Sequence, residues 1–150
     1  MTAETSRVVI ATALLLHGVA HLVALGALVA ILVGAHPPTG PVPRLWALPR
    51  LSTRTGALAG ALLWAAATAG FLGGAGAIWG LWLNASAWRP LSSGASMTSL
   101  LGLVVFAGTW PGSPSRKRSV LNTVIAVLVD GIILAAVVGL RWPPLDLLGR

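Results

Sequence analysis

Four long apolar stretches, separated by short polar or proline-rich segments, dominate the pattern of the chain. They cover about residues 8–33, 55–73, 90–110 and 119–140. A helix needs roughly 20 apolar residues to cross the roughly 30 Å hydrocarbon core of a bilayer. The pattern therefore predicts an all-α, polytopic membrane protein, a four-transmembrane-helix bundle that forms a single membrane domain over residues 1–150. The first stretch is much longer than the roughly 7–15-residue core of a signal peptide, so we expect it to remain as a helix.

The connections between the stretches contain the residues that end helices. Residues 34–54 are rich in proline, which removes a helical hydrogen bond, and this segment, which includes His36, is expected to be a loop. Glycines at 73, 74 and 76 indicate the end of the second helix. Residues 78–89 contain Trp79, Trp82 and Trp88, and tryptophan is enriched at membrane surfaces. We expect a short, tryptophan-rich interfacial segment there, before the third span.

Composition supports a membrane protein and restricts its chemistry. Hydrophobic residues make up 56% of the chain and charged residues only 9%, whereas soluble domains carry about 25% charge. The net charge of +7 comes from residues in the connections, so we expect contacts with lipid headgroups and no nucleic-acid partner. The absence of cysteine excludes disulfides and thiolate metal sites within this chain.

The distribution of basic residues predicts the orientation. The first and third loops carry Arg44, Arg50, Arg54, Arg116, Lys117 and Arg118, and the opposite side carries Arg7, Arg89, Arg141 and Arg150. Because cytoplasmic loops are enriched in Lys and Arg, this bias places both termini outside. Abundant alanine, glycine and arginine with a single lysine are typical of a GC-rich bacterial genome. We therefore expect a multi-pass protein of the bacterial plasma (inner) membrane.

Three ionisable side chains within the apolar stretches are the candidate chemistry. His17 and His21 are four residues apart, which places both on one face of the first helix. From the surface shared by the start of the first helix and the end of the fourth, His17 lies about 14 Å deep, His21 about 20 Å and Asp130 about 15 Å. We expect one imidazole to lie within hydrogen-bonding or one-water reach of Asp130. Asn122, about two turns before Asp130, is expected to join this polar seam.

Several roles fit such a group. The simplest is a hydrogen bond that keeps two helices in register. A proton or ligand site is the functional interpretation, since an ionisable residue inside a membrane is costly to bury. The third is ligation by His17 and His21 of a divalent metal or a haem, although no cofactor is our first expectation. Gly18 occupies the position at which a zinc peptidase of the H-E-x-x-H type requires glutamate.

Three short motifs carry a resemblance to a group of other proteins. They are the run Leu16-His17-Gly18-x-x-His21-Leu22, the tryptophans before the third span, and Trp110-Pro111 followed by Leu121-Asn122. Through these motifs, which are spread over most of its length, the chain resembles a group of small uncharacterised four-helix bacterial membrane proteins. The resemblance implies the architecture and supplies no activity. The proline-rich first loop and the mid-helix Asp130 do not match the group, so the pairing of histidine with aspartate depends on this sequence alone.

Two classes of function follow. The first is a non-enzymatic accessory or structural subunit, a homo-oligomer or part of a larger membrane complex embedded in the lipid bilayer, which the small-residue helices favour. The second is a small proton-, metal- or haem-linked transporter or cofactor protein that uses His17, His21 and Asp130. The sequence has no phosphate-binding loop, nucleophile triad or paired catalytic carboxylates, so we do not expect an enzyme.

Overall fold

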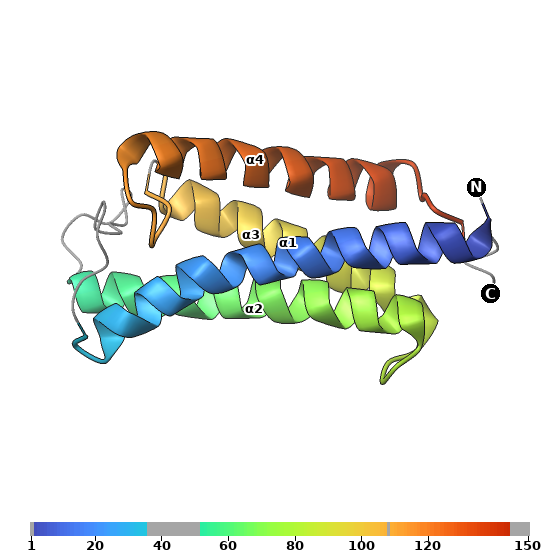
Figure 1. The fold of residues 1–150 in the computed structure, drawn as a ribbon, viewed down its shortest axis with the longest axis horizontal. Helices are drawn as coiled ribbons and strands as arrows, with labels where there is room; N and C mark the ends of the chain where they lie inside the picture. Colours follow the sequence, from blue (N-terminus) through green and yellow to red (C-terminus); the bar gives the residue numbers. More distant parts are fainter. Residues whose placement is uncertain (1, 36–51, 108, 145–150) are drawn as a thin grey trace.

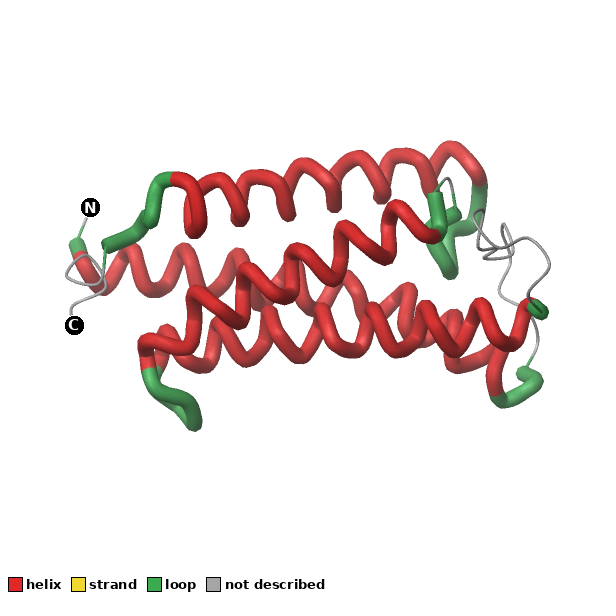
Figure 2. Tube along the Cα trace, turned by 180° about the vertical axis from the view of Figure 1, so that it is seen from behind, coloured by secondary structure: helices red, strands yellow, loops and turns green. Residues whose placement is uncertain are grey.

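The computed structural model describes residues 2–35, 52–107 and 109–144. These residues form four helices that run alternately up and down, together with the turns next to them (Figure 1). The helices are α1 (Ala3–Leu32), α2 (Thr53–Trp79), α3 (Trp88–Val105) and α4 (Arg116–Leu134). A 3-10 turn, η1 (Ala85–Ala87), precedes α3, and a π-helical turn, η2 (Ala135–Gly139), extends α4. The start of α1 and the end of α4 lie at the same end of the bundle, as the view from behind in Figure 2 also shows. The predicted all-α architecture of four helices is confirmed.

Among the described residues, three helical segments are long and apolar enough to cross a membrane: Ala3–Leu32, Thr53–Trp79 and Arg116–Gly139. The third helix is not in this set. It has 18 residues and contains three buried serines, Ser92, Ser96 and Ser99, whose hydroxyl groups reduce its apolar character. The proline-rich loop, with His36, lies outside the described residues.

Local hydrogen bonds explain where the helices begin and end. The hydroxyl groups of Thr2, Ser52 and Ser115 accept hydrogen bonds from backbone N–H groups in the first turns of α1, α2 and α4. Helix α2 ends at Trp79, and the following Gly80 has a φ of 67°, in the left-handed region that glycine adopts without strain. The N–H of Leu81 then donates to the carbonyl of Gly76, which is the pattern of a Schellman C-terminus.

Helix α2 continues beyond Gly73, where the sequence predicted its end. The reason is its tight packing against α3. A Cβ atom added at Gly70 would lie 2.8 Å from the Cβ of Ala95, and one at Gly74 would lie 2.6 Å from Ser92 Oγ. These glycines are therefore contact positions within a helix that tertiary packing stabilises, and they do not mark a break.

The tryptophan-rich segment differs in part from the prediction. Trp79 ends α2, and Trp82, in the following turn, is 68% exposed with its ring against Gly76. Trp88 is 1% exposed, because it begins α3 and belongs to the core together with Phe71 and Leu14. Only part of the segment can therefore lie at a surface.

The third helix is shorter than predicted. Helix α3 ends at Val105, and the chain beyond it turns back into the bundle before α4 begins. Trp110 and Ser113 are buried in this turn. The backbone N–H of Trp110 donates to the hydroxyl of Ser119. Trp110 is therefore an interior residue and not the end of a span.

The helices are not equally close to one another. Helix α2 packs closely on both α1 and α3, whereas α4 packs mainly on α3 and its backbone stays farther from α1. Two clusters of buried apolar side chains fill the bundle, one around Phe71 and Trp88 and the other around Trp64 and Phe106. Along α1, the residues of the first cluster extend as far as Leu14 and those of the second begin at Ala24. His17 and His21 therefore lie between the two clusters.

Candidate functional site

A histidine of α1 and the aspartate of α4 meet inside the bundle. His17 Nε2 lies 3.0 Å from Asp130 Oδ1. Asp130 is fully buried and the His17 side chain is 9% exposed. The prediction that one first-helix imidazole lies within hydrogen-bonding distance of Asp130 is confirmed. At this distance the two atoms form a hydrogen bond, in which either the imidazole N–H or a protonated carboxyl group is the donor.

The second imidazole occupies a different environment one turn along α1. His21 is fully buried, and its Nε2 lies 3.3 Å from the hydroxyl of Ser99 on α3. Its ring is stacked between Phe71, at 5.8 Å between centroids, and Trp110, at 5.9 Å. These aromatic faces and the hydroxyl fix the plane of the ring. Ser99 therefore links α3 to the second imidazole of α1.

The two imidazoles also contact each other. Their ring centroids are 4.9 Å apart with the planes at 70°, and the centroids of His17 and Phe71 are 4.7 Å apart with the planes at 76°. Gly18 makes this arrangement fit, because a Cβ atom there would lie 3.0 Å from the Cβ of Phe71. The glycine between the histidines is therefore the residue that lets α2 bring an aromatic ring against both of them.

Two polar atoms of the group have no hydrogen-bond partner within the part of the chain that the structure describes. They are Oδ2 of Asp130 and Nδ1 of His21. A buried polar atom without a partner is costly, so such atoms are uncommon in folded proteins. Each therefore marks a position at which a bound water molecule would supply the missing hydrogen bond.

A small cavity adjoins the pair on the side away from the N-terminus. It has a volume of about 250 Å³, and its lining includes His17, Trp110, Asn122 and Ala126. Asn122 does not bond to Asp130. Its Nδ2 donates to the hydroxyl of Ser113, at 3.3 Å. Asn122 therefore shares a cavity wall with His17, and its own hydrogen bond is to Ser113 and not to Asp130.

The metal interpretation finds no complete set of ligands. Within residues 2–35, 52–107 and 109–144, no group of three or more His, Cys, Asp or Glu side chains could hold a metal ion. In addition, Nε2 of His17 already faces Asp130 and Nε2 of His21 faces Ser99. Ligation of a metal or a haem by His17 and His21 stays a prediction that the geometry does not favour.

Sequence reasoning missed two aromatic members of the site. Phe71 and Trp110 flank His21, yet Phe71 is one of many apolar residues in α2 and Trp110 was expected at a helix end. One signal was available for Trp110. It precedes Pro111 and Gly112, a combination that favours a turn. The turn directs the tryptophan inwards, because Gly112, at a φ of 77°, packs against α1 at Ala27.

Comparison of the chain with protein-family models, with curated proteins and with solved structures gave no match. The resemblance to small four-helix bacterial membrane proteins therefore stays a prediction from short motifs. Any assignment of function has to come from the geometry of the site itself.

Proposed function

We propose that this chain is an integral membrane protein of the bacterial plasma membrane, with both termini outside, and that His17, His21 and Asp130 form a reversible proton-binding site inside it. The three long apolar helical segments support the membrane location. Helix α3 would be the fourth span, shielded by its neighbours, because the polar side chains that lower its hydropathy, such as Ser92 and Ser96, face inwards.

The observation that carries the proposal is the contact between His17 Nε2 and Asp130 Oδ1 in a buried position. Removing a charged group from water is strongly unfavourable, and it is offset only by a partner or by neutralisation. An imidazole and a carboxylate in contact offer both solutions, since the pair can be neutral overall with or without transfer of the shared proton. A third proton-binding group, His21, lies in contact with the same imidazole.

The cavity beside the pair supports the proposal, because it offers space for water next to His17. The cavity lined by His17 and Asn122 places a space of about 250 Å³ beside the pair, and Asn122 adds a polar wall to it. This volume exceeds what a few water molecules need. Water in this space would carry protons to His17. The rings of His17 and His21 are in contact, and a transfer between them would pass through a water molecule at Nδ1 of His21, which has no partner within the described residues.

The test compares two aspartate variants. Asp130→Asn keeps a group that can hydrogen-bond to His17 but removes the ability to bind a proton, and Asp130→Ala removes both. In proteoliposomes with an entrapped pH-sensitive dye and an imposed potassium diffusion potential, we expect proton uptake with the native chain. We expect none with either variant. Asn122→Ser, which keeps a small polar wall, is the matched control and should retain most of the uptake.

The second candidate is the non-enzymatic accessory or structural subunit, as a homo-oligomer or within a larger complex. It is favoured by α4, of whose apolar window only 17% is buried inside the chain. In that case the polar pair serves only to keep α1 and α4 in register. Asp130→Asn would then behave as the native chain in both stability and proton uptake, and that result would exclude the proton-binding role.

A further inference from the structure

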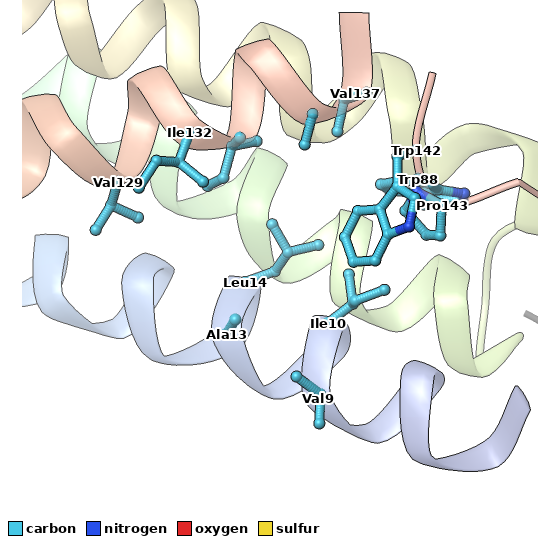
Figure 3. A pocket seen from close by; sticks show the side chains of 12 residues that line it. Val9, Ile10, Ala13, Leu14, Trp88, Val129, Ile132, Val137, Trp142 and Pro143 are labelled. Carbon is cyan, nitrogen blue, oxygen red and sulfur yellow. The ribbon is translucent and has the colours of Figure 1, made fainter. Parts of the chain in front are cut away.

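A second cavity lies between α1 and α4, on the other side of the polar pair (Figure 3). Its volume is about 300 Å³, and no polar atom contributes to its lining. Its lining includes a small residue from each side of the gap, Ala13 on α1 and Ala136 in η2, which leaves room for it. A cavity without polar groups does not stabilise water, so its natural occupant is a hydrocarbon.

The cavity opens towards the outside of the bundle. Val9 and Ile132 line it and are nevertheless 52% and 67% exposed. Leu14 and Trp88, at its back, are buried. An occupant can therefore enter sideways between α1 and α4. If the helices cross a membrane as proposed above, the opening faces the lipid chains.

Two arginines are neighbours in sequence of the residues that close the end of the cavity nearest to the termini. Trp142 and Pro143 close it there, and the neighbouring Arg89 donates from Nη2 to the carbonyl oxygens of Arg141 and Pro143, at 2.8 and 2.6 Å. Arg89 directly follows Trp88, another wall residue. Two guanidinium groups, those of Arg89 and Arg141, thus belong to residues next to the wall of an apolar space.

From this combination we infer that the cavity is a binding site for one acyl chain of an anionic phospholipid. The chain lies between Ala13 and Ala136, and the phosphate lies at the arginines. Each arginine near an anionic lipid surface favours binding by about fivefold. The inference rests on the proposed membrane location but not on the proposed proton-binding role. A bound chain would fill the gap that α1 and α4 leave between them.

The test uses tryptophan fluorescence, because Trp88 and Trp142 form part of the wall. The purified full-length chain in detergent is titrated with phosphatidylglycerol that has brominated acyl chains, and separately with the matching phosphatidylcholine. Bromine quenches a tryptophan that it contacts. We expect saturable quenching at lower concentration with phosphatidylglycerol, and a smaller amplitude in Trp142→Phe. Equal titrations with both lipids would exclude the anionic headgroup.

Two pairs of variants locate the site. Ala136→Phe fills the cavity and should abolish the saturable quenching, whereas Ala135→Phe, at the adjacent exposed position, should retain it. If Ala136→Phe does not fold, Ala13→Phe blocks the opposite wall. Arg141→Gln should reduce the preference for phosphatidylglycerol about fivefold, and Lys117→Gln, at the other end of α4, should not. Unchanged quenching in a folded cavity-filling variant would overturn the inference. A chain found in the soluble fraction would instead refute the membrane location itself.

Discussion

The two sides of α1 are constructed differently. Against α2 the helix packs through glycines, such as Gly18, where a Cβ would lie 3.0 Å from Phe71, and Gly60, where one would lie 3.0 Å from Leu28. Against α4 it leaves two cavities, of about 300 and 250 Å³, on either side of one hydrogen bond between His17 and Asp130. The α1–α2 interface is therefore stabilised by close packing, and the α1–α4 interface by a polar contact.

This difference shows how a small bundle can keep a site both fixed and accessible. The α1–α2 side fixes the imidazoles, because the close approach at Gly18 brings Phe71 against both rings. The α1–α4 side provides the carboxylate and the space next to it. A protein that only needed rigid packing would gain more dispersion energy by closing that gap.

The largest effect is expected from removing one member of the polar pair. His17→Leu leaves Asp130 buried without a partner, and we expect a loss of about 3–5 kcal/mol in the free energy of unfolding. Reversible denaturation in mixed micelles measures it. The double variant His17→Leu, Asp130→Leu should recover most of the loss, since two apolar side chains leave no unpaired polar group. A cost below about 1 kcal/mol for the single variant would mean that the pair does not hold the two helices together.

The next effect tests the tightly packed side of the bundle. Gly70→Ala places a methyl group 2.8 Å from the Cβ of Ala95 and close to the α3 backbone. We expect a loss of about 1–3 kcal/mol through overpacking, seen as a lower midpoint in the same denaturation assay. Gly131→Ala on α4 is the control, because it meets no atom within 4 Å. It should be neutral or stabilise by up to about 1 kcal/mol. Equal effects of the two substitutions would show that the close packing of α2, here against α3, contributes no more to stability than an open position on α4.

The smallest effect concerns the second imidazole. Ser99→Ala removes the hydroxyl that faces His21 Nε2, and hydrogen bonds between membrane helices contribute about 0.6 kcal/mol on average. We expect a loss of that size in stability, together with a changed ¹⁵N chemical shift of the His21 ring in NMR spectra. Thr98→Ala, whose hydroxyl bonds only to the carbonyl of Gly94 in its own helix, is the control. An unchanged His21 spectrum in Ser99→Ala would show that the serine does not orient the ring.

The candidate site was predictable to the extent that it depends on helical geometry. The spacing of His17 and His21 places them on one face, and equal depth in an alternating bundle brings Asp130 to the same level. Depth does not determine which imidazole faces the carboxylate. It also did not reveal that Asn122 bonds to Ser113, because a two-turn separation along α4 leaves the direction of a side chain undetermined.

The sequence by itself determined the four helices and the depth of the polar residues, because apolar length and helical rise are local properties. Only the tertiary structure decided that Gly70 and Gly74 are contacts within α2, that Trp88 and Trp110 are interior, and that α1 and α4 leave cavities between them. These features depend on which helix faces which, and that choice is made by the packing of side chains from distant parts of the chain.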